Sequence, residues 1–184
     1  MTHIFQRLDQ TARRPYSTQE YIRRILWNWT RAILIRPSPR MANRWRRFWA
    51  RRFGARIDSS SGFKSSTRIF HPWLLTVGRH CTLAEGVTVY NLGPIVIGDH
   101  TVLSQDVYLC AGTHDYAKPD LPLLRPAITI GNGVWICAGA FIGPGVKIGD
   151  NSIVGARAVV MSDVPSGVIV AGNPARVIKA RPIG

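Results

Sequence analysis

Aliphatic residues recur at every sixth position between residues 128 and 164 of the chain. The recurring positions are Ile130, Ile136, Ile142, Ile148, Val154 and Val160. A small or β-branched residue stands two positions before each of them, and a glycine often follows, as at Gly131 and Gly149. An amphipathic helix would repeat near 3.6 residues, so this spacing predicts short strands that a turn interrupts every six residues. We expect the glycines to serve these turns by adopting a positive φ.

Short strands of this kind cannot bury an apolar face singly, so the repeat predicts a solenoid of stacked units. The same period is present earlier in the chain, with a slip of two residues at Gly93 and Pro94. Its positions are Val77, Leu83, Val89, Ile97, Leu103 and Leu109. The loop of residues 110–127 separates the two runs. An insertion on a solenoid usually carries function, so we expect a site there.

Residues 17–53 follow a helical pattern instead, after a polar, basic stretch without periodicity in residues 1–16. Ser17 and Glu20 have the spacing of a capping box, which predicts the start of a helix. Apolar residues then follow at helical spacing, at Ile22, Ile25, Leu26, Trp29 and Ile33. Two prolines in residues 36–40 end this helix, and a second helix is predicted from about residue 40 to residue 53. The chain thus divides into a helical arm (residues 1–56), a β-helix (57–165) and a tail (166–184).

Positive charge is concentrated in the helical arm. The chain has 24 Lys and Arg against 10 Asp and Glu, a net charge of +14. The arm contributes +12, from 14 arginines against Asp9 and Glu20, and it holds Trp27, Trp29, Trp45 and Trp49. This mixture is typical of peripheral contact with an anionic membrane, here through residues 17–53. Alternatively an apolar stripe caps one end of the solenoid, and the two roles can fall on different faces. Nucleic-acid binding ranks below both.

The cysteines predict neither a disulfide framework nor a metal site. Cys81, Cys110 and Cys137 are odd in number and lack CxxC spacing. A signal peptide is not recognisable, and the apolar segments are too short and too interrupted by arginine to span a membrane. We therefore expect a cytoplasmic protein without bound metal, which can associate with the inner face of the membrane.

Several motifs resemble those of a known family. They are FGA at 53–55, GTHDY at 112–116, VWI at 134–136 and DVPSGVIVAGNPARVIK at 163–179. Together with the hexads they resemble the hexapeptide-repeat acyltransferases, and within these the sugar O-acetyltransferases of the galactoside, maltose and colanic-acid exopolysaccharide types. The resemblance implies an all-β, left-handed parallel β-helix that forms a homotrimer. It also implies transfer of an acetyl group from acetyl-CoA to a sugar hydroxyl of an exopolysaccharide or lipid-linked oligosaccharide.

A histidine suits such a reaction, because its pKa lies near the working pH and it can take a proton from the hydroxyl group. The chain has five histidines. His80 and His100 occupy the same phase of two hexads, His71 precedes a proline, and His3 lies near the start of the chain. His114 alone lies in the loop that interrupts the repeat, and by resemblance it is the catalytic base.

The remaining site residues are assigned by resemblance. Asn91 and Asp115 are candidates for binding the acceptor, although Asn91 is not in strict register with the family's acceptor-binding positions. The cofactor-binding candidates are Trp135, Ala138, Ala156, Met161, Ser162, Arg176 and Lys179. The alanines would offer backbone groups to pantetheine, whereas the two cationic residues would bind nucleotide phosphates. Trp135 can equally be an outward aromatic residue in a subunit contact.

Direct transfer is expected, with a backbone N–H from residues 137–140 stabilising the oxyanion. Cys110 and Cys137 are then not needed as nucleophiles. Other functions remain open. The same coil would serve an amino-sugar N-acetyltransferase or a serine-type acetyltransferase, and a non-enzymatic scaffold would keep the coil but not bind CoA. A zinc hydratase would need three histidines around the metal, and no histidine follows His114.

Overall fold

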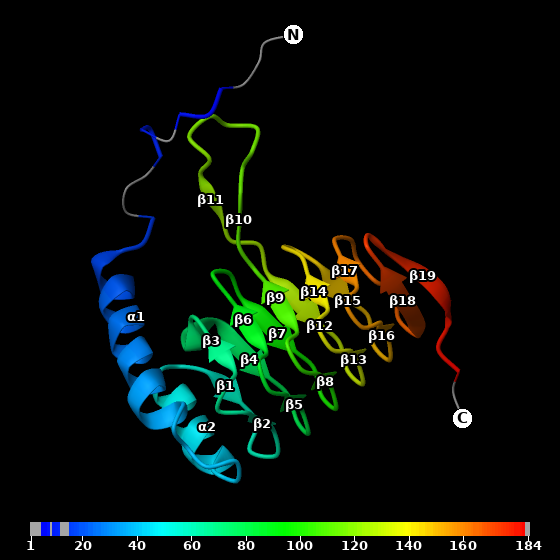
Figure 1. Ribbon diagram of the computed structural model, residues 1–184, viewed down its shortest axis with the longest axis horizontal. Helices are drawn as coiled ribbons and strands as arrows, with labels where there is room; N and C mark the ends of the chain where they lie inside the picture. The colour runs from blue at the N-terminus through cyan, green and yellow to red at the C-terminus, as the bar shows by residue number, and fades with distance from the viewer. Residues whose placement is uncertain (1–4, 8, 12–14, 183–184) are drawn as a thin grey trace.

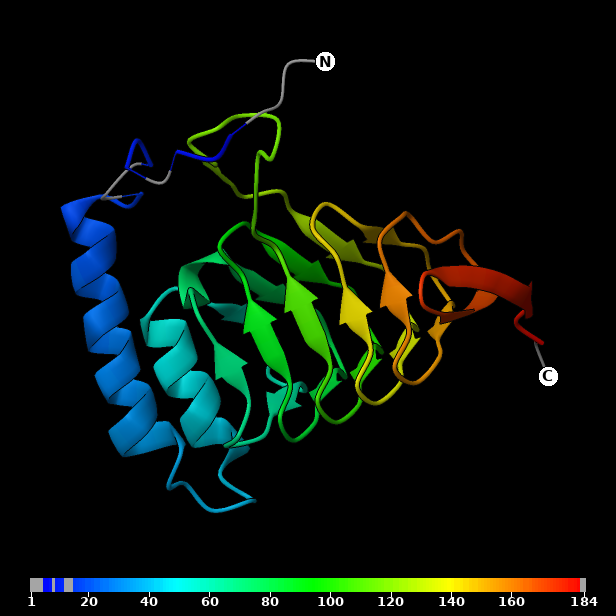
Figure 2. The same cartoon turned by 45° about the horizontal axis from the view of Figure 1, so that its top comes forward.

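The computed structural model describes residues 5–7, 9–11 and 15–182, so His3 lies outside the described part of the chain. The chain winds into a parallel coil with three faces, and a pair of helices lies at its N-terminal end (Figures 1 and 2). The helical segments are α1 (Thr18–Thr30), the π-helical η1 (Arg31–Ile35), α2 (Asn43–Arg52) and the 3₁₀ turn η2 (Pro72–Leu74). The capping box predicted at Ser17 and Glu20 is present at the start of α1.

Three sheets form the faces of the coil. Sheet A contains β1 (Arg56–Ile57), β4 (Leu75–Val77), β7 (Ile95–Ile97), β12 (Ile128–Ile130) and β15 (Lys147–Ile148). Sheet B contains β2 (Gly62–Phe63), β5 (Thr82–Leu83), β8 (Val102–Leu103), β13 (Trp135–Ile136), β16 (Ile153–Val154), β18 (Val168–Gly172) and β19 (Ala175–Ala180). Sheet C contains β3 (Arg68–Ile69), β6 (Thr88–Tyr90), β9 (Tyr108–Cys110), β14 (Phe141–Ile142) and β17 (Val159–Val160).

The predicted hexad positions are the core of a left-handed parallel β-helix of about six turns. They are buried, and equivalent positions of successive coils stack in register, as in the row of Val77, Ile97, Ile130 and Ile148. The coil continues past residue 165, because β18 pairs in parallel with β16 and buries Val170. The solenoid predicted from the period of six is confirmed, as is the left-handed parallel β-helix that the resemblance implies.

The glycines after the aliphatic positions have a different role from the one expected. Gly131 and Gly149 do not have a positive φ; the left-handed residues come two positions later, at Gly133 (φ 64°) and Asn151 (φ 56°). A Cβ atom at Gly149 would lie 2.5 Å from the backbone nitrogen of Ser166 in the next coil. Glycine is therefore required there by the close approach of neighbouring coils rather than by the turn itself.

The arm covers the first coil with its inner face. Figure 2 shows both helices at the end formed by β1–β3, with α1 outside α2. Trp27 is buried and donates its indole N–H to Ile69 O at 2.6 Å. Arg46 is fully buried, and its guanidinium donates to Phe63 O at 2.7 Å and to Pro39 O at 2.8 Å. These contacts satisfy buried polar groups at the end of the solenoid, as a cap must.

The helical apolar stripe faces away from the coil. Ile22, Ile25, Leu26, Trp29 and Ile33 are each more than half exposed. The arginines interleaved with them lie closer to the coil: Arg23 stacks over Trp73 at 4.3 Å, and Arg24 stacks over Tyr16 at 4.2 Å. The outer face of α1 is thus almost uncharged. Of the two alternatives for the arm, capping is seen on the inner face, while the outer face has no cover within the described residues.

Candidate active site

The loop of residues 110–127 forms a hairpin that projects from the coil (Figures 1 and 2). Its strands, β10 (Thr113–His114) and β11 (Leu123–Leu124), pair antiparallel, with His114 opposite Leu123. His114 is exposed, and its Nδ1 lies 2.6 Å from the carbonyl oxygen of Leu121. A carbonyl oxygen only accepts hydrogen bonds, so Nδ1 carries the proton and Nε2 keeps its lone pair.

The tip of the hairpin is ordered by short-range contacts. Leu121 lies in the turn of the hairpin, and its carbonyl oxygen contacts His114. Its φ is 47°, a left-handed conformation that is uncommon for a leucine. Asp115 accepts a hydrogen bond from the backbone N–H of Ala117 at 3.1 Å and lies 3.9 Å from Lys118 Nζ. Asp115 is only partly exposed, next to the imidazole in sequence, and its carboxylate contributes to the turn.

The base of the hairpin is attached to the arm through Arg125. Its guanidinium pairs with Glu20 at 3.2 Å and donates to Pro15 O at 2.6 Å. It also lies over the ring of Tyr16, 4.6 Å from the ring centre. The sequence analysis did not single out Arg125, because both of its partners lie about a hundred residues away in the chain. This junction links the position of the His114 hairpin to the start of α1.

Asn91 does not lie in an accessible site. It is fully buried, and its side-chain oxygen accepts from the backbone N–H of His71 at 2.9 Å while its amide donates to His71 O. The side chain therefore closes the turn of one coil onto the coil below. Its hydrogen-bonding capacity is used by the main chain, and Asn91 is withdrawn as an acceptor-binding residue. In the sequence, the sign against this role was that Asn91 is out of register with the acceptor-binding positions of the family.

The outer face of sheet B brings together most of the cofactor candidates. Trp135 points outward from β13, is 46% exposed, and donates its indole N–H to Ser104 Oγ at 3.0 Å. Its register partners are Ile153 on β16 and, through it, Ile169 on β18. Cross-strand partners point to the same side of a sheet, so these residues form one continuous row.

A β-bulge places Arg176 and Lys179 on that same face. They are three residues apart on β19, and a regular strand would direct them to opposite sides. The pairing shifts by one residue between Ile169 and Val170, so that Lys179 pairs with Ile169 and Arg176 pairs with Ala171. Ile169 and Ala171 both face outward, and the two cationic side chains therefore do so together. Both are exposed, and within the described residues neither has a salt-bridge partner.

Ala138 and Ala156 lie at the corner where sheet B turns into sheet C, one coil apart. Both are exposed. Among the described residues the backbone N–H of neither alanine has a hydrogen-bond partner, whereas Cys137 and Gly139 donate to Val154 and Gln105. Two unpaired donors beside the Trp135 row suit carbonyl oxygens of acetyl-CoA, in its thioester and its pantetheine chain. The residues present thus fit the cofactor that the resemblance implies.

Met161 and Ser162 lie apart from this group. They follow β17 and belong to the corner between sheets C and A, on the side from which the His114 hairpin leaves the coil. Both are exposed. The candidate site residues of a single chain therefore fall into two groups, here called half-sites, on opposite edges of sheet C. One contains His114, Asp115, Met161 and Ser162. The other contains Trp135, Ala138, Ala156, Arg176 and Lys179.

The cysteines and metal chemistry do not add to these half-sites. Partial burial raises the pKa of the Cys110 and Cys137 thiols, which keeps both in the unreactive neutral form. In the described part of the chain no group of three potential metal ligands converges. Across the same residues, no helix has the length and apolar character needed to cross a membrane.

Comparison with known proteins decides the family. Residues 127–161 match the model described as bacterial transferase hexapeptide (six repeats). The chain is 41% identical, over 85% of its length and 86% of the relative, to WcaF of Escherichia coli (strain K12), provisionally named a colanic acid biosynthesis acetyltransferase. The chain belongs to the hexapeptide-repeat acetyltransferases. The assignment agrees with the buried hexads and with the inserted hairpin.

Further relatives extend the comparison. The galactoside O-acetyltransferase of Escherichia coli (strain K12) is 36% identical over 56% of this chain and 52% of its own. A hexapeptide-repeat acetyltransferase of Vibrio cholerae O1 biovar eltor, solved with acetyl coenzyme A, superposes with a TM-score of 0.83. That structure is 24% identical and covers 96% of both chains, so it supports the fold of this family member.

Proposed function

We propose that this protein transfers an acetyl group from acetyl-CoA to a hydroxyl group of a sugar, with His114 as the general base. The contact of His114 Nδ1 with Leu121 O carries the proposal, because it leaves Nε2 free and accessible. Nε2 takes the hydroxyl proton as the oxygen attacks the thioester carbonyl, and it then gives this proton to the departing thiolate of CoA. The reaction needs no covalent enzyme intermediate, which agrees with the neutral cysteines.

The negative charge that develops on the carbonyl oxygen needs a hydrogen-bond donor. Within residues 137–140 the backbone N–H groups of Cys137, Gly139 and Ala140 are used inside the coil. Ala138 alone retains an unpaired N–H among these four described residues, and we assign it this role. Ala156, one coil further on, and the cationic pair on β19 would bind the pantetheine and phosphate parts of acetyl-CoA.

A homotrimer would join the two half-sites. Sheet C separates them, so copies that turn sheet C toward a common axis would bring the hairpin of one chain to the Ala138 corner of the next. The outer surface of sheet C supports this arrangement, because Tyr108 stacks on Phe141 at 5.6 Å and lies 6.1 Å from Tyr90. Light scattering should report three chains for the wild type and fewer for Tyr108→Glu. A monomeric wild type that is fully active would contradict the trimer.

The acceptor is a sugar of an exopolysaccharide or of a lipid-linked oligosaccharide. The names of WcaF and of the galactoside relative favour this class, and the carboxylate of Asp115 beside His114 can bind sugar hydroxyl groups. An amino sugar or a serine-like acceptor is the second candidate, since the coil and the thioester site would be the same. Both require catalysis, in contrast to a scaffold that keeps the coil alone.

One experiment separates these candidates. The purified protein is incubated with acetyl-CoA and a panel of lipid-linked oligosaccharides, soluble sugars, amino sugars and serine, and the new acetyl group is located by mass spectrometry. We expect an O-acetyl sugar with the wild type and at least about 100-fold slower product formation with His114→Ala. Acetylation of an amine would select the second candidate. Absence of both acetyl transfer and CoA binding would indicate that the protein is a non-enzymatic scaffold.

A lipid-linked acceptor would place the enzyme at the cytoplasmic face of the membrane. The exposed apolar face of α1 supports peripheral contact there, because Ile22, Leu26 and Trp29 have no cover among the described residues. Trp29 and its neighbours can enter the interfacial region while the arginines of the arm meet anionic headgroups. Nucleic-acid binding would need a charged outer face, and α1 presents an apolar one.

A further inference from the structure

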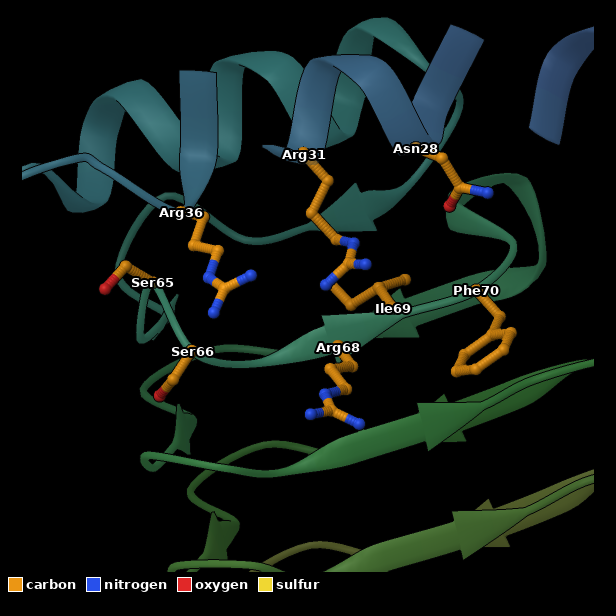
Figure 3. Close-up of a pocket in the computed structure, with 8 residues that line it drawn as sticks. All are labelled: Asn28, Arg31, Arg36, Ser65, Ser66, Arg68, Ile69 and Phe70. Atoms are coloured by element: carbon orange, nitrogen blue, oxygen red, sulfur yellow. The ribbon is translucent and has the colours of Figure 1, made fainter. Parts of the chain in front are cut away.

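A pocket of about 540 Å³ opens between the helical arm and the first coil. Its cationic lining consists of Arg31 from η1, Arg36 from the turn directly after η1 and Arg68 from β3. Figure 3 shows Arg31 and Arg36 pointing toward the strand that carries Arg68, with Ser65 and Ser66 at one side. The site is remote from both half-sites of the acetyl-transfer reaction in sequence, and no motif of the chain draws attention to it.

These three arginines differ from the other arginines that the fold uses. Arg46 and Arg51 donate to backbone carbonyls, and Arg125 pairs with Glu20. The side chains of the three pocket arginines, in contrast, have no hydrogen-bond or salt-bridge partner anywhere in the described residues. No carboxylate lines the pocket. Three like charges that converge without a counter-charge repel one another, so the folded chain holds an unneutralised positive site.

The electrostatics of Arg31 agree with this picture. Its pKa is held below the usual arginine value, first because burial disfavours the charged form and then because Arg68 and Arg36 repel it. An arginine does not deprotonate under these conditions, so the unfavourable interaction remains until an anion enters. An anion within the pocket would remove the repulsion and gain several charge-assisted hydrogen bonds at once.

Neutral donors complete the lining. Ser66 Oγ accepts from the backbone N–H of Gly86 at 3.0 Å, which leaves its hydroxyl hydrogen free to donate into the pocket. Ser65 and Asn28 offer further polar groups. Guanidinium forks combined with hydroxyl donors match the oxygens of a phosphate group better than those of a carboxylate, which has fewer acceptors. We propose that the pocket of Arg31, Arg36 and Arg68 binds a phosphate or diphosphate group.

The ligand that bears this group can be a lipid or a soluble phosphate ester. Asn28 lines the pocket and lies on α1 next to Trp29, which belongs to the uncovered apolar face. A phosphate with an attached acyl or polyprenyl chain would therefore find a polar pocket and an apolar helix face close together. A soluble diphosphate would use the pocket alone. The two sources share the same pocket chemistry and differ in their dependence on Trp29.

Binding of inorganic pyrophosphate to the full-length protein tests the pocket itself. Calorimetry should detect binding to the wild type, about tenfold or more weaker binding to Arg68→Gln or Arg31→Gln, and wild-type binding to Arg40→Gln. Arg40 lies on the arm, is exposed and does not line the pocket. Arg40→Gln therefore removes one positive charge, as the pocket variants do, without changing the pocket. Equal weakening by Arg40→Gln, or no binding by the wild type, would overturn the proposal.

Thermal stability gives a second readout that a folding defect cannot imitate. Without phosphate in the buffer, Arg68→Gln should raise the melting temperature, because it removes a like charge. Pyrophosphate should raise the melting temperature of the wild type and have a smaller effect on Arg68→Gln. A lower melting temperature for Arg68→Gln in both conditions would mean that the arginine is structural and would contradict the proposal.

Vesicle flotation identifies the source of the phosphate. Vesicles of phosphatidylglycerol and phosphatidylcholine should bind the wild type and lose binding with Trp29→Ser and with Arg68→Gln, while Trp29→Ser keeps its affinity for pyrophosphate. That result selects a lipid phosphate. If Arg68→Gln loses pyrophosphate binding but floats with the vesicles as the wild type does, the ligand is a soluble phosphate ester. If the wild type binds a random DNA duplex more tightly than it binds pyrophosphate or the vesicles, both sources are refuted.

The pocket is independent of the proposed acetyl transfer. Arg31→Gln should acetylate a water-soluble acceptor at the wild-type rate, because Arg31 lies on η1 and belongs neither to a half-site nor to sheet C. Pyrophosphate binding by an enzyme without transferase activity would disprove the proposed function and leave the pocket standing. Transferase activity without pyrophosphate binding would do the reverse.

Discussion

The His114 hairpin and the outer face of sheet B, which we propose as the two halves of the active site, are built in opposite ways. The sheet B face is part of the regular coil, where Trp135, Ile153 and Ile169 are held in register by the hexads. The hairpin interrupts that repeat and is held by Leu121 O at its tip and by Arg125 at its base. In the proposed reaction the coil would provide a rigid binding platform, and the insertion would provide the base.

In the proposed mechanism the same difference would leave a monomer incomplete. The coil fixes the two halves on opposite edges of sheet C, and no movement within a packed solenoid brings them together. A repeat fold can change what it does by exchanging an insertion while its binding surface stays the same. Each of the following variants alters one half and leaves the other intact.

Replacing the base should have the largest effect. His114→Ala should lower kcat roughly 10²- to 10⁴-fold, the usual contribution of a general base, while leaving the affinity for CoA unchanged because the sheet B face is untouched. His100→Ala, at an exposed position of the coil, is the matched control. Steady-state kinetics and CoA titration measure the two quantities. Retained activity of His114→Ala would refute the mechanism.

Altering the platform should have a smaller effect of a different kind. Arg176→Ala combined with Lys179→Ala should raise the KM for acetyl-CoA about 10- to 100-fold with little change in kcat, since the phosphates lie far from the reacting carbonyl. Lys147→Ala, on sheet A, should behave as the wild type. A double variant with unchanged KM would show that the bulge on β19 does not serve the cofactor.

The junction of hairpin and arm should affect catalysis indirectly. Arg125→Ala should lower kcat by about tenfold and leave the KM for acetyl-CoA unchanged, because a displaced hairpin misplaces His114. Arg125→Lys, which keeps the pair with Glu20, should recover part of the loss. If both variants only lower the melting temperature and kcat stays constant, Arg125 stabilises the fold without positioning the base.

Acid should weaken the coil beneath this junction, which is the smallest effect expected at neutral pH. His71 is buried with both ring nitrogens unpaired among the described residues, and burial lowers its pKa to about 4. The unfolded chain binds the proton near pH 6.5, so stability should fall as the pH decreases from about 6.5 to about 4, by at most about 1.4 kcal/mol per unit. Above pH 6.5 the titration of His71 makes no contribution to the pH dependence of stability.

Chemical denaturation across this pH range measures the effect. His71→Phe keeps an aromatic ring against Trp73, which stacks on His71 at 4.9 Å, and should show a shallower dependence than the wild type. His80→Gln, at an exposed corner, should follow the wild type. Identical slopes for all three proteins would mean that His71 does not titrate in this range.

The coil could be predicted from the sequence because the aliphatic position of each hexad identifies the residue that the hexad buries. The aliphatic positions, the slip at Gly93 and the inserted loop all follow from local spacing, and the structure confirms them. The role of Gly149 was predicted wrongly, because the backbone of the next coil decides it and that approach is not visible in a single hexad. The burial of Asn91 likewise depends on the turn of a neighbouring coil.

The half-sites were predictable only in part. The interruption of the repeat pointed to His114, and the family resemblance supplied the residues of sheet B. The bulge that turns Arg176 and Lys179 to one face results from strand pairing and cannot be read from spacing. The arm was harder still. Its helices were expected, but the outward apolar face of α1 and its inward arginines depend on the contacts of Arg23 with Trp73 and of Arg24 with Tyr16, which the spacing does not show.

Mixing two inactive variants tests the split site most directly. His114→Ala lacks the base, and Ala138→Trp blocks the platform with a bulky side chain at an exposed corner. When they are denatured together in equal amounts and refolded, mixed trimers should form sites with an intact hairpin from one chain and an intact platform from its neighbour. About one quarter of the sites should be complete, and activity should recover to that level, if chains assemble at random. If the hairpin serves its own chain, every site lacks one half, and the mixture should stay as inactive as either variant alone.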